Sequence, residues 1–95
     1  MFTYTNDELQ SVFDTCFESR EPLILKQFPA KEKKKYLVLL WIKDIFIKDV
    51  MYTESDVNTL LKPIYHDYVT LRRYLIDYQF LMRKRDGSVY MKTEN

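Results

Sequence analysis

The sequence of 95 residues contains one glycine, one cysteine and one histidine, and each scarcity excludes a class of site. A single cysteine, Cys16, cannot form an internal disulfide bond. One histidine and one cysteine are too few for a zinc site, unless carboxylates supply the remaining ligands. One glycine leaves no glycine-rich loop of the kind that cradles phosphate groups. We therefore expect no metal and no other cofactor.

Long apolar runs and activated side chains are also missing. No apolar run reaches the ~18 residues that a membrane span needs, and the N-terminus lacks the charged-then-apolar pattern of a signal peptide. We therefore expect a cytoplasmic protein with no membrane partner. The histidine, His66, directly precedes Asp67, but neighbours in sequence rarely face each other, and no activated nucleophile is apparent. We do not expect an enzyme.

Apolar residues, in contrast, are abundant for so short a chain. Hydrophobic residues make up 46% of the sequence and aromatic residues 16%. The length is typical of one domain over residues 1–95, and a domain of this size can bury only part of its surface. We therefore expect some of the apolar residues to lie in an interface, such as that of a homodimer.

The N-terminal segment TNDELQSVFDTCFESR predicts an amphipathic helix over residues 5–20. Thr5 and Glu8 form a capping-box pattern at its start. Apolar residues follow at helical spacing on one face: Leu9, Val12, Phe13, Cys16 and Phe17. This pattern places Cys16 in the core. Pro22 is expected to end the helix, and the next segment, LILKQF, supplies either a short strand or an extended linker.

A second helix is expected from Ala30 to about Phe46. Its segment Tyr36–Ile42 is apolar at seven consecutive positions, which covers every side of a helix. A helix that is apolar all round must be buried all round. In so short a chain this requires either the central position in the fold or a second subunit that covers one side.

Two shorter helices are predicted next. Thr53 is a suitable N-cap for the first of them, which ends close to Lys62 because Pro63 follows. Asp67 is a suitable N-cap for the second, over Tyr68–Tyr78. Two short helices joined by about four residues are typical of a helix-turn-helix.

The C-terminal segment predicts a β-hairpin around Asp86-Gly87, the dipeptide that favours a two-residue type I′ turn. This turn pairs Arg83 with Tyr90 and Met82 with Met91. Side chains alternate between faces, so one face is largely apolar and carries Phe80, Met82, Lys84, Val89 and Met91. The opposite face carries Leu81, Arg83, Arg85, Ser88, Tyr90 and Lys92. We interpret this second face either as a solvated surface or as a cationic wing that contacts phosphate groups.

The outward side of the helix at 68–78 has a mixed character. If Leu71 points inward, steps of 100° centre the outward side on Arg73, Val69 and Ile76. A helix that reads bases needs donors and acceptors there, whereas two of these residues are β-branched hydrophobes. The lysine run at 31–35 is similarly ambiguous, because it is either a solvated helix start or a contact for phosphates or for an acidic partner.

Four segments in order resemble a bacterial domain of unknown function that occurs alone or at the C-terminus of some winged-helix transcriptional regulators. They are FPAKEKKK (28–35), YTESDVNTLL (52–61), LRRYLIDYQFL (71–81) and RDGSVY (85–90). The resemblance implies a winged-helix-like fold and an association with transcription, but no binding residues. The usual form has a glycine, a natural left-handed helix terminator, where this chain has Gln79. The missing glycine is expected to affect how sharply the chain turns from the helix into the following strand, and not the fold itself.

We therefore expect a mainly helical α+β domain. A winged helix-turn-helix-like core would cover residues 28–92 with a C-terminal two-stranded wing, and the extra helix at 5–20 would be a dimerisation element. The leading hypothesis is a dimeric DNA-binding transcriptional regulator. It would contact duplex DNA through Arg72, Arg73, Arg83, Lys84, Arg85, Lys31, Lys33, Lys34 and Lys35.

The alternative is a protein-interaction module, such as a phage-encoded inhibitor or a subunit of a complex, that has the winged-helix shape and does not bind DNA. Its protein partner would contact Val69, Ile76, Asp77 and Trp41.

Overall fold

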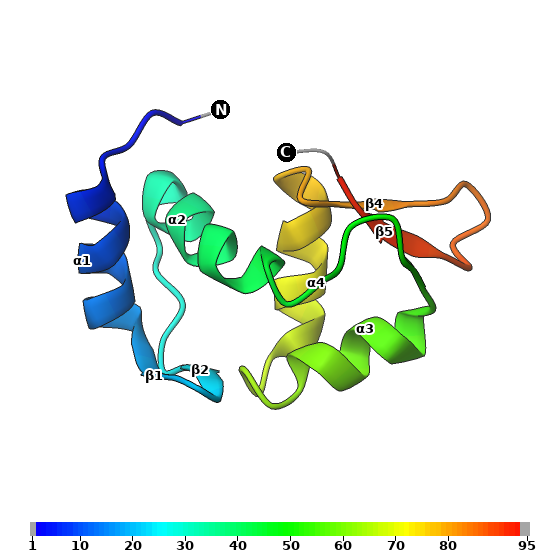
Figure 1. Ribbon diagram of the computed structural model, residues 1–95, viewed down its shortest axis with the longest axis horizontal. Helices are drawn as coiled ribbons and strands as arrows, with labels where there is room; N and C mark the ends of the chain where they lie inside the picture. The colour runs from blue at the N-terminus through cyan, green and yellow to red at the C-terminus, as the bar shows by residue number, and fades with distance from the viewer. Residues whose placement is uncertain (1, 94–95) are drawn as a thin grey trace.

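The computed structural model describes residues 2–93, and in this range the chain forms four helices and two small antiparallel sheets. The elements follow the order α1 (Asn6–Cys16), β1 (Phe17–Arg20), β2 (Leu23–Leu25), α2 (Glu32–Lys43), β3 (Met51–Tyr52), α3 (Glu54–Leu61), α4 (Tyr68–Asp77), β4 (Leu81–Arg83) and β5 (Tyr90–Lys92). Figure 1 shows the α1 and β1–β2 end on one side of α2, and α4, α3 and the second sheet on the other. The mainly helical α+β class is confirmed.

Helix α1 begins as predicted and ends earlier than predicted. The amide of Glu8 donates to Thr5 Oγ1 at 3.1 Å and the amide of Thr5 donates to Glu8 Oε1 at 3.0 Å, which completes the capping box. The helix ends at Cys16 because Phe17 takes an extended conformation and pairs with Leu25 in the β1–β2 hairpin. The prediction of a helix to residue 20, ended by Pro22, was therefore wrong. Pro22 instead lies in the turn of this hairpin, after a cis peptide bond.

Helix α2 occupies the centre of the fold. It is shorter than the predicted Ala30–Phe46, but its apolar segment is buried as expected, with Leu37, Val38, Leu39 and Ile42 at most 2% exposed. Helix α1 packs against one side of it and α4 against another. The seven-residue apolar segment is thus covered within the chain, and it requires no second subunit. Cys16, which is 3% exposed, lies in the same core, as predicted.

Helices α3 and α4 follow their local capping signals. Thr53 Oγ1 accepts from the amide of Asp56 at 3.0 Å, and Asp67 Oδ1 accepts from the amide of Thr70 at 3.3 Å. These bonds satisfy free amides in the first turns. Both predicted N-caps are confirmed, and each helix ends within a residue or so of the predicted position.

The corner between α4 and β4 is sharp although glycine is absent. Gln79 has a φ of 66°. The amide of Phe80 donates to the carbonyl of Leu75 at 2.8 Å, and the amide of Gln79 donates to the carbonyl of Ile76 at 2.9 Å. These two bonds form the Schellman motif that normally places glycine in the left-handed position. The glutamine therefore keeps the corner, in a conformation that a side chain with a Cβ disfavours.

The second sheet has three strands in the order β3-β5-β4. The predicted pairs of Arg83 with Tyr90 and Met82 with Met91 are confirmed. The strand β3, which pairs Met51 with Met91, was not predicted.

The turn of the hairpin differs from the type I′ turn that we expected. The amide of Lys84 donates to the carbonyl of Val89 and that of Gly87 to the carbonyl of Lys84, both at 2.8 Å, so the loop is longer than two residues. Gly87 has a φ of 76°, whereas the φ of Asp86 is not positive. A type I′ turn needs positive φ at both central residues. Asp86 Oδ1 instead accepts from the amide of Ser88 at 3.0 Å, an Asx turn.

The two faces of the hairpin are also reversed at its base. Leu81 and Tyr90, on the face that we assigned to a cationic wing, are each 1% exposed. Met82, on the face that we expected to be inward, is 52% exposed. The Tyr90 hydroxyl donates to Glu54 Oε1 of α3 at 3.1 Å, so the large tyrosine ring takes the inner side of β5.

Candidate functional site

Arg72 ties α4 to α3 rather than facing solvent. Its side chain is 16% exposed, it donates to Asn58 Oδ1, and its Nη2 lies 3.7 Å from Glu54 Oε1. Glu54 also accepts the hydroxyl of Tyr90, so one carboxylate joins α3, α4 and β5. The positive charge of Arg72 is therefore already paired, which weighs against its predicted role in contacting DNA.

The outward side of α4 carries charges of both signs. Arg73 and Asp77 are exposed, and Val69 is 42% exposed. Ile76 is half-buried and packs against the core. This face thus offers phosphate one cation beside one anion, and its central apolar residues fit a protein contact at least as well.

Two of the four candidate lysines at the start of α2 are engaged within the chain. Lys33 Nζ lies 2.7 Å from Glu8 Oε2, and Lys35 Nζ lies 3.5 Å from Glu32 Oε1. Lys35 also donates to the hydroxyl of Tyr74 at 3.4 Å, and this hydrogen bond raises the pKa of the lysine. Lys31 and Lys34 are exposed and form no ion pair with any residue in the range 2–93.

The hairpin keeps its cations on the surface. The Arg83 guanidinium lies 6.0 Å from the centroid of the Tyr90 ring. It also lies beside Gly87, where an added Cβ would come within 2.4 Å of Arg83 Nη2. Lys84 and Arg85 are exposed towards the tip. These three side chains form a positive end to the second sheet.

Trp41 is used for packing inside the chain. Its indole Nε1 donates to the carbonyl of Leu9 at 3.0 Å, and its ring centroid lies 4.9 Å from that of Phe13. The Arg20 guanidinium covers it at 5.2 Å from the ring centroid. Trp41 therefore anchors α1 and β1 to α2, and this geometry leaves little of it for a partner.

An exposed row of methionines crosses the second sheet. Met51 of β3 and Met82 of β4 both stand opposite Met91 of β5, so the three side chains share one face. Met51 is 59% exposed, Met82 is 52% exposed, and Met91 is half-buried. We call Met51, Met82 and Met91 the methionine face. Sequence reasoning missed it because β3 was not predicted and because Met82 was placed on the largely apolar face of the hairpin, opposite the face considered for a partner.

The methionine face leads into a hollow beside α4. The hollow has a volume of about 400 Å³ and is lined by Ile76, Gln79, Leu81, Met82, Arg83 and Thr93. It brings Ile76, one of the residues predicted for a protein interface, next to Met82. The surface is therefore continuous from the sheet to the C-terminal end of α4.

Strand β4 forms an open edge next to this hollow. The amide of Lys84 donates to Val89, and the amide of Thr93 donates to the carbonyl of Phe80 at 3.0 Å. Because bonding alternates along an antiparallel pair, the backbone groups of Leu81 and Arg83 point away from β5. Arg83 is exposed, so its backbone groups are accessible to an added strand, whereas Leu81 is only 1% exposed and its groups are covered.

The chain was compared with known families, curated proteins and solved structures. The model of a bacterial family, DUF2087, described as an uncharacterized protein conserved in bacteria, matches residues 24–92. The chain belongs to this family. Neither the search of curated proteins nor that of solved structures found a match. The predicted resemblance to a bacterial domain of unknown function is thereby confirmed for most of the chain.

The matched part of this DUF2087 chain contains α2, α3, α4 and the whole three-stranded sheet, whereas α1 and β1 precede it. The methionine face therefore lies inside the family region. Over residues 2–93 no helix is long and apolar enough to cross a membrane. The same residues contain no group of three or more His, Cys, Asp or Glu side chains arranged to hold a metal ion.

Proposed function

We propose that this DUF2087 chain is a protein-interaction module with a winged-helix-like fold, whose partner binds at the methionine face. The observation that carries the proposal is the row of Met51, Met91 and Met82 across three strands, more than half exposed at both ends. Methionine side chains are flexible and polarisable, and they recur on surfaces that adapt to partners. Exposed apolar residues that lie side by side mark interaction sites.

The partner that fits this surface is an extended protein segment with apolar and acidic residues. An added strand would hydrogen-bond to the exposed edge of β4 at Arg83, as in other cases of strand addition. Its apolar side chains would enter the hollow next to Met82 and Ile76. Its acidic side chains would meet the positive end formed by Arg83, Lys84 and Arg85.

The winged-helix part of the proposal is supported by the order of elements. Helix α2, strand β3, the α3–α4 pair and the β4–β5 hairpin follow one another, with β5 between β3 and β4. Winged helices also serve as protein docking modules, since a fold does not determine a function. The association with transcriptional regulators that the resemblance implies would place the partner in bacterial transcription.

Site-specific crosslinking in bacterial cells tests the proposal. A photoreactive amino acid placed at Met51 or at Met82 should give the same crosslinked product, and the exposed Thr59 on α3 is the matched control position. Met82→Glu should remove the product formed from position 51, because it puts a charge in the middle of an apolar contact. Equal crosslinking from position 59, or a product that Met82→Glu leaves unchanged, would contradict the proposal.

DNA binding is the second candidate, because Arg73, Arg83, Lys84 and Arg85 remain on the surface. A mobility shift on mixed duplex DNA over a salt series separates it from the first. Phosphate contacts predict retention at low salt and a steep loss as salt rises, and Arg83→Glu with Arg85→Glu should abolish it. Our proposal predicts no retention at micromolar protein in ~50 mM salt, a condition in which nonspecific binding would be retained.

The predicted homodimer is a separate question. The central helix α2 is covered within the chain, so it no longer argues for a second subunit. Light scattering at high concentration checks this prediction, and a dimer that Met82→Glu dissociates would identify the partner at the methionine face as a second copy.

A further inference from the structure

A groove of about 400 Å³ lies between α1 and α2, remote in the chain from the methionine face. Helix α1 contributes Asp7, Glu8, Ser11 and Val12 to its lining, and the start of α2 contributes Lys31, Lys33, Lys34 and Leu37. Helix α1 precedes the family match at residues 24–92, so the groove is formed where the N-terminal addition meets the family region. Pockets of 300–1,000 Å³ are of the size that holds a small organic molecule.

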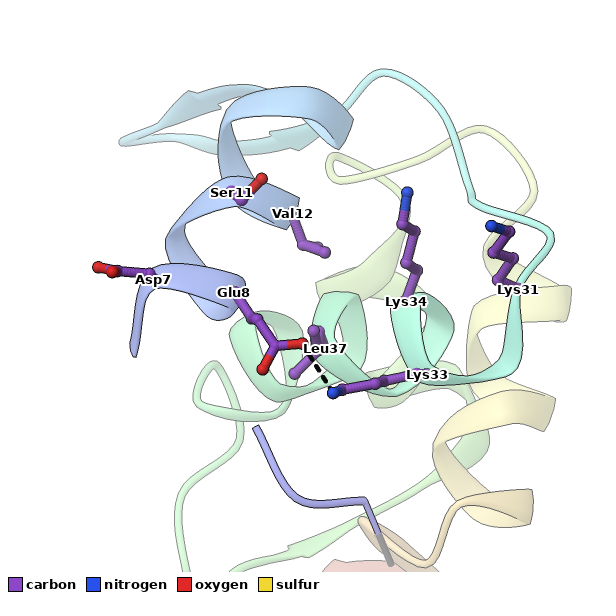
Figure 2. Close-up of a pocket in the computed structure, with 8 residues that line it drawn as sticks. All are labelled: Asp7, Glu8, Ser11, Val12, Lys31, Lys33, Lys34 and Leu37. Atoms are coloured by element: carbon purple, nitrogen blue, oxygen red, sulfur yellow. Dashed lines mark ion pairs between the residues drawn. The ribbon is translucent and has the colours of Figure 1, made fainter. Parts of the chain in front are cut away.

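The groove has an apolar floor and one closed end. Figure 2 shows Val12 and Leu37 extending into the space between the two helices, and these residues are 5% and 2% exposed. The ion pair of Glu8 with Lys33, at 2.7 Å, bridges the helices at one end. Asp7 points away from the groove. The two acidic residues of the lining are therefore either neutralised or turned outward.

The other end of the groove is cationic. The side chains of Lys31 and Lys34 extend in the same direction, away from the Glu8–Lys33 pair, and Ser11 carries a hydroxyl on the α1 side. Both lysines are exposed and form no ion pair with the described part of the chain. An apolar floor next to two ammonium groups is complementary to an amphipathic anion.

We propose that this groove binds a small carboxylate with an apolar body, of the class of the medium-chain alkyl carboxylates. The alkyl chain would lie against Val12 and Leu37, which removes the apolar surface of the ligand itself from water. The carboxylate would accept charge-assisted hydrogen bonds from Lys31 and Lys34, whose long stems bring the ammonium groups to the anion. Bound in this way, the ligand joins α1 to the family region. The proposal is independent of the interaction at the methionine face.

Octanoate, octanol and octylammonium are matched probes because they share one alkyl chain and differ in charge. Each is titrated into the full chain, and the methyl NMR signals of Val12 and Leu37 in the groove and of Met51 and Met82 outside it are followed. We expect octanoate to bind at least ten-fold more tightly than octanol, with octylammonium weakest. Equal binding of octanoate and octanol would overturn the anion site, and signals that shift only at Met51 and Met82 would overturn its location. No octanoate binding up to millimolar concentration would overturn the proposal altogether.

Variants separate charge from fold. Lys31→Gln with Lys34→Gln should weaken octanoate at least ten-fold and leave octanol unchanged. Lys84→Gln with Arg85→Gln removes the same charge at the hairpin and should leave octanoate unchanged, so an equal loss in this control would overturn the proposal. Ser11→Trp fills the groove from an exposed position and should abolish the binding of both probes. Octanoate binding that survives Ser11→Trp, with melting temperature unchanged, would place the ligand elsewhere.

Discussion

Replacing Gln79 with glycine should make the protein more stable. Gln79 holds the left-handed position of the Schellman motif at a φ of 66°. This conformation costs a residue with a Cβ about 1–2 kcal/mol. Glycine avoids that cost, but its greater freedom in the unfolded chain removes about 0.4–1 kcal/mol of the gain. We therefore expect the glycine variant to exceed the alanine variant by about 1 kcal/mol in the free energy of unfolding.

The comparison of glycine with alanine isolates the backbone effect. Gln79→Ala and Gln79→Gly both remove the glutamine side chain and its interactions, so their difference reports the Cβ alone. For a domain of this size about 1 kcal/mol corresponds to ~4–8 °C in melting temperature. Urea unfolding should show a higher midpoint for the glycine variant with an unchanged m-value.

Arg73 supplies the control position, because it is exposed in the middle of α4 with ordinary helical geometry. There glycine should be less stable than alanine by about 1 kcal/mol. The sign of the glycine-minus-alanine difference should thus reverse between positions 73 and 79. A negative difference at both positions would refute the strained corner at Gln79.

Three further predictions concern stability. Arg72→Ala should cost about 1–2 kcal/mol, because it leaves the half-buried Asn58 without its charged donor and removes the ion pair with the exposed Glu54, whereas Arg73→Ala should stay within about 0.5 kcal/mol in urea unfolding. Leu39→Ala should cost about 2–5 kcal/mol at a site with 0% exposure, whereas Ile47→Ala, at 66% exposure, should be close to neutral. Tyr78→Phe should flatten the dependence of stability on pH at both extremes. The hydrogen bond from Tyr78 lowers the pKa of Glu32 below its usual 4.5, so the stability from this pair is lost as the pH falls through the lowered value. Burial and Glu32 raise the pKa of Tyr78, so stability is also lost above pH 10, the usual value for tyrosine. A Tyr78→Phe profile as steep as that of the wild type would contradict the coupling.

Local chemistry made several features predictable. Thr5, Thr53 and Asp67 each cap a helix through atoms within three residues of themselves, so a short segment contains all the information needed. The pairing of Arg83 with Tyr90 was likewise predictable, because Lys84 stands opposite Val89 whether the loop has two residues or four, so the register of the strands is the same.

Features that depend on distant partners were not predictable. Strand β3 has only two residues and pairs with Tyr90–Lys92, far along the chain, so no alternation marks it. Phe17 continues the helical spacing of α1, yet its pairing with Leu25 outweighs that local preference. Sequence reasoning separated the hairpin residues correctly into two sets. Each set mixes apolar and cationic residues, so only the fit of Tyr90 beside Glu54 decides which set faces inward.

The candidate site shows the same limit. Arg72 and Arg73 are adjacent and chemically identical, but α3 takes one into an ion pair and leaves the other in solvent. Lys33 and Lys34 differ in the same way, because only Lys33 reaches Glu8 on α1. The packing of a second helix decides which of two neighbouring cations stays free for a ligand. The residues next to a cation in the sequence do not reveal that packing.

The middle strand of the larger sheet is also the last element along the described chain, and this has a consequence for folding during synthesis. In the described range β3 and β4 pair only with β5, so neither has a ladder partner until residues 90–92 have left the ribosome. Tyr90, which is 1% exposed and completes the core beside α3, arrives at the same moment. Chains grow from the N-terminus and fold as units. The helices can therefore assemble around α2 first, and the sheet closes in one late step.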